Sequence, residues 1–154
     1  MQTTFSYDAD GRLSSISYPA GTASASFSYD GAGRLVRMSD ELGTTEYGYA
    51  AAGRLVNRTR NGRTVRYQYD AANQLTSIDY WGRGTVAYRY DSAGRLSSFT
   101  PWGTGELGFS WNASGELVGE SWPGGVNSTY HSDGAGRLIR LATGTLLDLE
   151  DRYD

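Results

Sequence analysis

Few side chains in this chain are suited to catalysis by proton transfer or nucleophilic attack. The 154 residues include one histidine, His131, and neither cysteine nor lysine. A nucleophile and its base must meet in space, so the sequence neighbours Ser132 and Asp133 do not make His131 part of a catalytic triad. We expect His131 to be a solvent-facing strand residue, and we predict no catalytic residue and no enzymatic activity.

Two acidic segments have residue types that bind metal ions. The segment DADG, from Asp8 to Gly11, resembles the start of a calcium loop but lacks the third alternating acidic ligand. Asp148, Glu150 and Asp151 form an acidic group that is more typical of a solvated patch than of a ligand set. We predict neither a metal site nor a cofactor.

Three tryptophans are spaced so that their rings can stack on a ligand. Trp81, Trp102 and Trp122 recur about 20 residues apart, and exposed aromatic rings stack on sugars. Choline- and glucan-binding modules, which this pattern resembles, are also arrays of short units with aromatic residues, Asp and Gly. A carbohydrate- or cell-wall-binding module is therefore the alternative prediction. Single tryptophans at turns are also compatible with packing on the next unit.

These residues belong to a sequence that repeats one seven-residue phrase. The phrase appears as YDADGRL, YDGAGRL, YAAAGRL, YDAANQL, YDSAGRL, WNASGEL and SDGAGRL. Its fifth positions, at steps of 22, 20, 20, 21, 21 and 21 residues, are Gly11, Gly33, Gly53, Asn73, Gly94, Gly115 and Gly136. Such a regular period indicates a repeat architecture, in which each unit contacts chiefly its neighbours. We predict one array over residues 1–154, with both ends inside a repeat.

Each phrase lies among residues typical of a β-hairpin. Alternating aromatics such as Tyr88 and Tyr90 are typical of a strand with an aromatic face. The following D-x-x-G suits a type I turn with positive φ at its fourth residue, and Asn73 is the substitute that best tolerates this conformation. Leucine then opens a second strand. Its L-x-x-apolar pairs, such as Leu96 and Phe99, lie on opposite faces of a regular strand, or on one face if a bulge follows the turn.

A second turn, variable in length and always containing glycine, separates successive hairpins. The Asn61-Gly62 pair is a strong signal for a type I′ turn. Two strands and two turns in about 21 residues leave roughly five to seven residues per strand. The sequence therefore predicts an all-β array of about seven antiparallel β-hairpin repeats, with about fourteen strands in a meander. Twist is expected to make this continuous sheet curved or spiralling.

The second and sixth positions of the phrase are suited to pair with each other. Such Asp/Arg pairs are Asp8/Arg12, Asp30/Arg34, Asp91/Arg95 and Asp133/Arg137. Where the arginine becomes Glu116, the aspartate has become Asn112, which avoids facing carboxylates and indicates contact. We predict that the phrase residues act in folding rather than in chemistry. This structural motif consists of Tyr7, Asp8, Gly11, Arg12, Leu13, Tyr29, Asp30, Gly33, Arg34, Leu35, Tyr49, Gly53, Arg54, Tyr69, Asp70, Asn73, Tyr90, Asp91, Gly94, Arg95, Leu96, Trp111, Gly115, Asp133, Gly136 and Arg137.

The phrase Y-D-x-x-G-R-L, with an aromatic residue two positions earlier, resembles the YD repeat of the Rhs family. That family includes Rhs polymorphic toxins, shell proteins of insecticidal toxin complexes, and teneurins. The resemblance covers nearly the whole chain. It implies a continuous β-sheet that spirals into a hollow shell, which encloses a C-terminal toxin or, in teneurins, builds an extracellular scaffold. The family's DPxG-type core and a toxin domain are absent from these residues.

Charge and resemblance together define the expected function. With 17 acidic residues, 14 arginines and a net charge of −3, we predict no nucleic-acid partner, and no apolar run is long enough for a membrane span. The resemblance implies a secreted or cell-surface location. We predict a non-catalytic structural segment of a shell or scaffold. Its partners are flanking YD repeats of a longer parent chain, an encapsulated toxin domain in that parent, or other copies that join through open sheet edges into a filament; carbohydrate is a partner only under the alternative.

Overall fold

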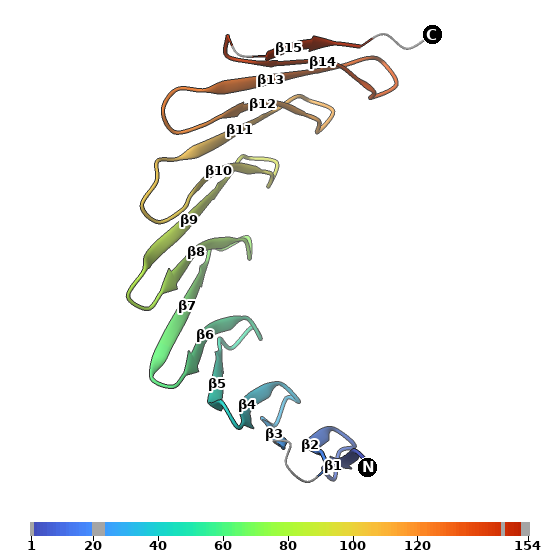
Figure 1. The fold of residues 1–154 in the computed structure, drawn as a ribbon, viewed down its shortest axis with the longest axis vertical. Coiled ribbons are helices and arrows are strands. Elements are labelled where there is room, and N and C mark those ends of the chain that lie inside the picture. The colour runs from blue at the N-terminus through green and yellow to red at the C-terminus, as the bar shows by residue number, and fades with distance from the viewer. Residues whose placement is uncertain (1, 20–23, 146, 152–154) are drawn as a thin grey trace. The chain divides into compact units, whose positions relative to one another are not determined.

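The computed structural model is all-β and describes residues 2–19, 24–145 and 147–151 (Figure 1). Fifteen strands follow one another in sequence order in one open antiparallel sheet, and no helix occurs in the described ranges. The predicted meander of hairpins is therefore confirmed, with one strand more than the fourteen expected. The additional strand, Leu147–Glu150, forms from the acidic C-terminal segment.

The strands are four to seven residues long, and only the first and last, with four residues each, are shorter than the five to seven predicted. In chain order they are β1 (Thr4–Tyr7), β2 (Leu13–Ser17), β3 (Ala25–Tyr29), β4 (Leu35–Asp40), β5 (Gly43–Tyr49), β6 (Leu55–Arg60), β7 (Arg63–Tyr69), β8 (Leu75–Tyr80), β9 (Gly84–Tyr90), β10 (Leu96–Thr100), β11 (Leu107–Trp111), β12 (Leu117–Ser121), β13 (Asn127–Ser132), β14 (Leu138–Thr143) and β15 (Leu147–Glu150).

The chain divides into two compact units. The first comprises Met1–Gln68 with Asp79–Gly82, and the second comprises Tyr69–Ile78 with Arg83–Asp154. Within the first unit β1 to β6 pair in succession, and β7 pairs with β6. Within the second unit β9 to β15 pair in the same way.

A bulge after six of the motif turns decides which side chains share a face. In the β9–β10 hairpin, Tyr90 lies opposite Leu96, whereas Arg89 lies opposite Ser98, so one extra residue interrupts β10. Phe99 consequently lies opposite Tyr88, on the same face as Leu96. The sequence left this choice open. Corresponding shifts occur in the hairpins β1–β2, β3–β4, β5–β6, β11–β12 and β13–β14.

The two faces of the sheet differ in chemistry because strand side chains alternate. The face that we call the aromatic face carries, in the second unit, Tyr88, Phe99, Leu107, Phe109, Trp111 and Leu117. The corresponding face of the first unit carries Phe5, Ile16, Phe27 and Met38. The opposite face carries small polar residues, which include Ser6, Ser15, Ser26 and Ser39 in the first unit and Ser98, Ser110 and Ser121 in the second.

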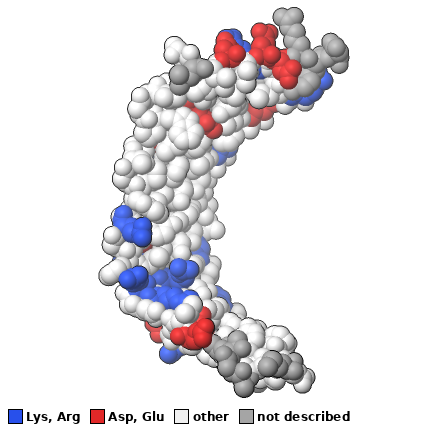
Figure 2. Space-filling view, in the orientation of Figure 1, with Lys and Arg blue, Asp and Glu red and all other residues white. Residues whose placement is uncertain are grey.

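The sheet is a single layer, so most side chains are only partly buried. Val86, at 5% exposure, is the one apolar residue classed as buried among those described. Cross-strand pairs take over part of the role of a core: the rings of Tyr88 and Phe99 stack with centroids 6.0 Å apart. On the face drawn in Figure 2, charged side chains form separate groups with uncharged areas between them. Stability must therefore depend largely on contacts between neighbouring strands and repeats.

Candidate functional site

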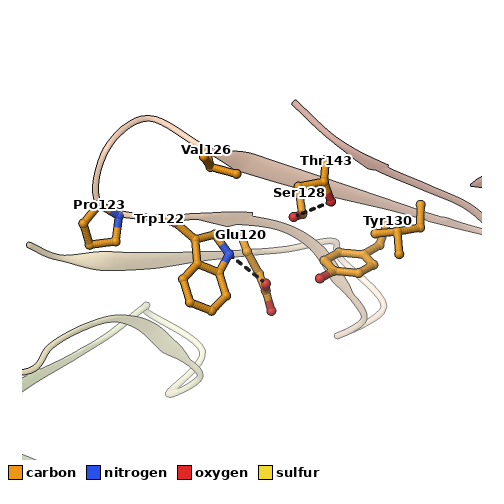
Figure 3. A pocket seen from close by; sticks show the side chains of 8 residues that line it. Glu120, Trp122, Pro123, Val126, Ser128, Tyr130 and Thr143 are labelled. Atoms are coloured by element: carbon orange, nitrogen blue, oxygen red, sulfur yellow. Dashed lines mark hydrogen bonds between the residues drawn. The ribbon is translucent and has the colours of Figure 1, made fainter. Parts of the chain in front are cut away.

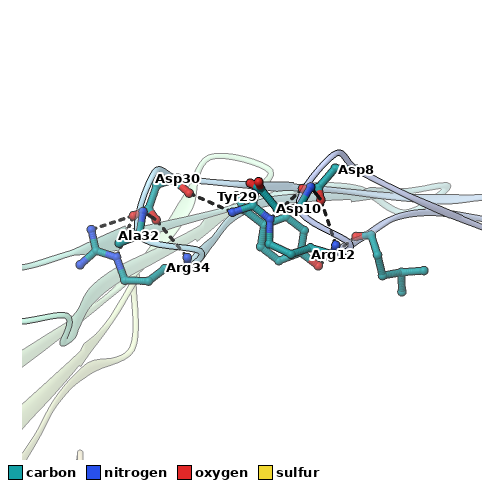
Figure 4. A network of polar contacts seen from close by, with 8 residues as sticks. Asp8, Asp10, Arg12, Tyr29, Asp30, Ala32 and Arg34 are labelled. Atoms are coloured by element: carbon teal, nitrogen blue, oxygen red, sulfur yellow. Dashed lines mark hydrogen bonds and ion pairs between the residues drawn. The ribbon is translucent and has the colours of Figure 1, made fainter.

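The aspartate of the phrase organises its own turn. Oδ1 of Asp8 accepts hydrogen bonds from the backbone N–H groups of Asp10, at 3.0 Å, and Arg12, at 2.9 Å. Oδ2 accepts a third from Arg12 Nε at 2.7 Å. Asp30 and Arg34 repeat this arrangement (Figure 4). The backbone closes the same turn with bonds from Asp8 N–H to the carbonyl of Arg12 and from Gly11 N–H to the carbonyl of Asp8.

All seven copies of the phrase make these two backbone bonds, at 2.8–3.1 Å. The fifth residue has positive φ in every copy, including Asn73 at 70°. The expected ion pairs Asp8/Arg12, Asp30/Arg34, Asp91/Arg95 and Asp133/Arg137 each have an N–O distance of 2.7 Å. Asp10 also contacts Arg12 at 2.7 Å, so this arginine supplies the positive charge beside both carboxylates of the DADG segment.

These bonds favour the charged form of the aspartates. The backbone N–H of the arginine is the main cause that lowers the pKa of Asp8, Asp30 and Asp133 below 3.8, and the arginine side chain contributes as well. For Asp91 the side-chain bond to Arg95 is the largest cause of the lowered pKa. The carboxylates thus remain ionised and bonded at neutral pH.

The same arginine also reaches the next repeat. Nη1 of Arg12 donates to the carbonyl of Asp30 at 3.3 Å, and its guanidinium lies 5.0 Å from the ring centroid of Tyr29. In the opposite direction, the hydroxyl of Tyr29 donates to the carbonyl of Leu13 at 2.9 Å. Two hydrogen bonds and a cation–π contact therefore join adjacent repeats, and all three use residues of the phrase.

Other repeats make corresponding links with different residue types. Arg34 donates to the carbonyl of Ala50, and Tyr49 to that of Leu35. Arg95 donates to the carbonyl of Asn112, and Tyr90 to that of Leu75. Where tyrosine becomes Trp111, the indole Nε1 donates to the carbonyl of Leu96 at 2.8 Å, so a ring N–H replaces the hydroxyl. An indole N–H can therefore take the place of the tyrosine hydroxyl at this position.

The copies that depart from the phrase keep its hydrogen bonds in part. Gln74 in place of arginine donates to the carbonyl of Gly94 at 2.9 Å. Asn112 donates through Nδ2 to Glu116 at 2.7 Å and accepts the Glu116 backbone N–H through Oδ1 at 3.0 Å. The contact expected from this exchange of residues is therefore present. Ala50 supplies the backbone groups of its turn but has no carboxylate.

The second turns carry contacts of their own in the first unit. Asn61 and Gly62 both have positive φ, at 49° and 75°, as the type I′ turn requires. Arg60 Nη2 donates to both oxygens of Asp40, at 2.8 and 3.0 Å, and Asn61 Nδ2 donates to the carbonyl of Leu42 at 3.0 Å.

The three candidate ligand-stacking tryptophans lie on separate second turns. Trp81 has the guanidinium of Arg63 over its ring at 5.3 Å. Trp102 lies beside Gly84, where a Cβ would meet the Trp102 Cβ at 3.5 Å. Trp122 differs from both because its Nε1 donates to Glu120 Oε2 at 3.3 Å and its ring lines a pocket. The tryptophans are 56%, 42% and 47% exposed, respectively.

The pocket at Trp122 lies on the aromatic face of the second unit (Figure 3). It has a volume of about 500 Å³, and its lining residues are Glu120, Trp122, Pro123, Val126, Ser128, Tyr130, Leu141 and Thr143. Ser128 and Thr143 hydrogen-bond to each other at 2.9 Å. Burial, and then the hydrogen bond with Glu120, raises the pKa of Tyr130 above 10.0. Of this group only Trp122 was predicted from the sequence, although Glu120 interrupts the L-x-x-apolar pattern.

The remaining chemical candidates are dispersed. His131 is exposed on β13, opposite Arg140, and the alternation of the strand directs it away from Ser132. Asp148 pairs with Arg140 at 2.7 and 2.9 Å. Within the described ranges, no three His, Cys, Asp or Glu residues gather closely enough to hold a metal ion. No helix in the part of the chain that the structure describes is long and apolar enough to cross a membrane.

Hairpins joined through phrase residues define a YD-type repeat sheet, and comparison with known families agrees. The sequence model described as Teneurin YD-shell matches residues 1–149. The chain belongs to this family. A search of curated proteins gave no match.

Solved structures with similar folds are toxin complexes. The crystal structure of TcdB2-TccC3-Cdc42 has a TM-score of 0.76 and 20% sequence identity; the match covers 99% of this chain and 10% of that one. The structure of the Photorhabdus luminescens Tc holotoxin pore, which carries a TccC3 mutation, has a TM-score of 0.77 and 18% identity, with 92% and 9% covered. This chain thus spans about a tenth of these relatives.

Proposed function

We propose that the chain is a non-catalytic structural segment of a YD-type shell or scaffold in a secreted or cell-surface protein. One observation carries the proposal: the polar side chains of the phrase bond to their own turn or to the adjacent repeat, as Arg12 does with Asp8 and with the Asp30 carbonyl. Side chains engaged in this way position neighbouring repeats rather than a reactant. The placement of the chain in the YD-shell family supports this role.

The first partner that we propose is a flanking YD hairpin that pairs with β1. Tyr7 in β1 occupies the position of Tyr29 and Trp111, whose donors bond to leucine carbonyls of the preceding repeat. Tyr7 is 62% exposed and Phe5 53% exposed, so this edge presents aromatic rings to solvent. A strand that begins with Arg-Leu after a turn would provide both the carbonyl for Tyr7 and a guanidinium for its ring.

A synthetic peptide of residues 84–100, which contains β9 and β10, tests this pairing with the full chain. In the intact protein β10 pairs with β11, and Arg95 lies 5.9 Å from the ring centroid of Trp111. We expect the peptide to shift the NMR signals of β1 amides. Tyr7→Ala in the chain, or Arg95→Ala in the peptide, should weaken binding by about tenfold, which corresponds to about 1.4 kcal/mol. Unchanged β1 signals would contradict the proposed partner.

Association of whole copies into filaments is tested by a separate measurement. Light scattering and electron microscopy of one sample give mass and shape together. Particles that grow with protein concentration and are broken by a charged residue in β1, such as Phe5→Asp, support assembly through the sheet edges. A constant monomeric mass at all concentrations contradicts it and leaves flanking repeats of a parent chain as the partners. An encapsulated toxin domain in that parent is the further partner that the family resemblance implies.

Carbohydrate binding is the second candidate function. The exposure of the rings of Trp81, Trp102 and Trp122 favours it, because an exposed indole ring can stack on a sugar ring. Quenching of tryptophan fluorescence by glycans or choline, lost on Trp122→Ala but retained on Trp111→Ala, would support this function. If neither glycans nor choline changed the fluorescence spectrum, carbohydrate binding would be contradicted and the structural function would remain.

A further inference from the structure

Glu120 places a negative charge where five of the other six hairpins carry an apolar side chain; the sixth carries Arg58, opposite Tyr47. The position is the fourth residue of the strand that follows the motif turn. In other copies it is Ile16, Met38, Phe99 or Leu141, each opposite an aromatic residue of the preceding strand. In this copy Glu120 lies opposite Phe109 in β11 and opposite Ser128 in β13. A carboxylate between these strands has a desolvation cost that an apolar residue would avoid.

The groups that contact Glu120 are neutral. Trp122 Nε1 donates to Oε2 at 3.3 Å, and Tyr130 is its other hydrogen-bonding neighbour. Among the ion pairs between described residues, none involves Glu120, whereas the phrase aspartates have arginine partners at 2.7 Å. A carboxylate has about four acceptor positions. Glu120 therefore has capacity for a cationic donor.

Trp122 presents an aromatic surface beside this charge. Four other rings in the chain have a guanidinium over them at 4.9–5.9 Å, namely those of Tyr29, Tyr49, Trp81 and Trp111. In the part of the chain that the structure describes, no such cation lies over Trp122, whose side chain projects toward the same pocket as Glu120 (Figure 3). The pocket thus combines the two groups that bind guanidinium elsewhere in this molecule.

We propose that the pocket formed by Glu120, Trp122, Val126 and Tyr130 binds the arginine side chain of another polypeptide. The guanidinium contacts the carboxylate of Glu120 and stacks on the indole ring, because planar cations with several N–H donors suit both surfaces. Val126, with Pro123 and Leu141 nearby, contacts the methylene groups of the arginine. The pocket is an open depression on the face of the sheet, so the main chain of the bound residue remains outside it.

We favour arginine over a sugar because the pocket contains a carboxylate, and only a cationic ligand can pair with that charge. A pyranose could stack on Trp122, but Glu120 would then remain without a positive partner. Two ligands of nearly equal shape separate these cases: the tripeptides acetyl-Gly-Arg-Gly amide and acetyl-Gly-citrulline-Gly amide. Citrulline replaces one guanidinium nitrogen by oxygen and has no charge.

The experiment is an NMR titration of the full chain with each tripeptide and with methyl glycosides, observed at the indole N–H of Trp122. The arginine peptide is expected to shift this signal with at least tenfold higher affinity than the citrulline peptide. Glu120→Gln should reduce the arginine affinity by about tenfold, since a hydrogen-bonding side chain remains but its charge is lost. Glu106→Gln removes a carboxylate outside the pocket and should leave the affinity unchanged.

Three outcomes would overturn the proposal. They are equal affinity for arginine and citrulline, full binding by Glu120→Gln, and a response to glycosides with none to arginine. If Glu120→Gln alters the far-UV spectrum, Trp122→Phe tests the site instead, with the titration followed at the backbone amide of Glu120. This variant keeps an aromatic ring and should weaken arginine binding while the far-UV spectrum stays that of the parent. None of these outcomes changes the pairing of β1 with a flanking strand, so the shell function is tested separately.

Discussion

The aspartate carboxylate of the phrase holds both the backbone of its own turn and the side chain of the arginine four residues later. In Asp91 one oxygen accepts the backbone N–H groups of Ala93 and Arg95, both at 2.9 Å, and the other accepts Arg95 Nε at 2.7 Å. The aspartate therefore orients the arginine whose remaining nitrogen reaches Asn112. Local turn formation and the link to the next repeat depend on one residue.

Gly94 tests the backbone requirement of this turn. Its φ is 80°, and an added Cβ would also lie 3.2 Å from Gln74 Nε2. Gly94→Val is expected to destabilise the fold by about 1 kcal/mol or more, because positive φ is costly for a β-branched residue. Urea unfolding measures the change. Ala93→Val, in the same turn but without positive φ, is the control; equal effects of the two would refute the backbone explanation.

The lowered pKa values of Asp8, Asp30, Asp91 and Asp133 predict the direction of acid destabilisation. The folded chain holds these protons less tightly than the unfolded chain, so the stabilisation is complete above about pH 5 and is lost as pH falls below 3.8. The melting temperature should therefore fall across this range. Asp91→Asn should show a smaller fall between pH 5 and 3; a slope identical to that of the parent would contradict the assignment to Asp91.

Ala50 offers the reverse experiment. Its turn has the usual backbone bonds but lacks the carboxylate that caps the N–H groups of Ala32 and Arg34 in the preceding copy. Ala50→Asp is expected to stabilise the chain by about 0.5–1.5 kcal/mol, the range for a hydrogen bond. Thermal and urea unfolding would measure it. Ala51→Asp adds the same charge to the same turn without these acceptor positions and should give no gain.

At the scale of the element, four of the six junctions between successive hairpins have side-chain bonds in both directions. The ring donor bonds to the leucine carbonyl behind it, and the arginine bonds to the carbonyl ahead. Strand pairing alone permits register slips in a sheet with small polar residues on one face. The additional bonds at these four junctions favour one register.

Removal of one ring donor should show how much a single hydrogen bond between repeats contributes to the free energy of unfolding. Tyr90→Phe deletes the hydrogen bond to the Leu75 carbonyl, at 3.0 Å, while the ring remains. We expect a loss of about 0.5–1.5 kcal/mol in the free energy of unfolding. Tyr7→Phe is the matched control, since Tyr7 lies at the edge and is 62% exposed. Similar losses for both variants would show that the hydroxyl bond is not the source.

The hairpins were predictable because their determinants lie within a few residues. Asp, the turn glycine and arginine are separated by at most four positions, and the fold class, the turns and the ion pairs follow from that spacing. The links between repeats were not predictable in the same way. The groups that accept from Arg12 and Tyr29 are main-chain carbonyls, which any residue type provides.

The pocket at Trp122 depends on residues from three strands and a turn, so no local pattern reveals it. Tyr130 and Thr143 come beside Glu120 only through the register of β12 with β13 and that of β13 with β14. The available signal was a charged residue at an apolar position. Without the pairing register, that signal does not identify the residues around it.

At the scale of the whole molecule, a single-layer sheet with few buried side chains should not unfold uniformly along its length. In the second unit, Val86 and Ser98 are 5% exposed, whereas every residue of β15 is exposed. We expect amide exchange to be slowest in β9 and β10 and progressively faster toward β15, as in repeat proteins with nearest-neighbour coupling. Hydrogen exchange followed by NMR measures this gradient. Equal opening free energies across β9 to β15 would indicate one cooperative unit instead.

The motif turns are constant in length, whereas the second turns vary. Every motif turn closes with the same pair of backbone bonds. Among second turns that lie wholly within the described residues, the length ranges from residues 41–42 between β4 and β5 to residues 101–106 between β10 and β11. Differences in repeat length are thus confined to one side of each hairpin. Length and register are decoupled: a repeat of this kind can gain or lose loop residues while its aspartate, arginine and ring donor stay aligned with those of its neighbours.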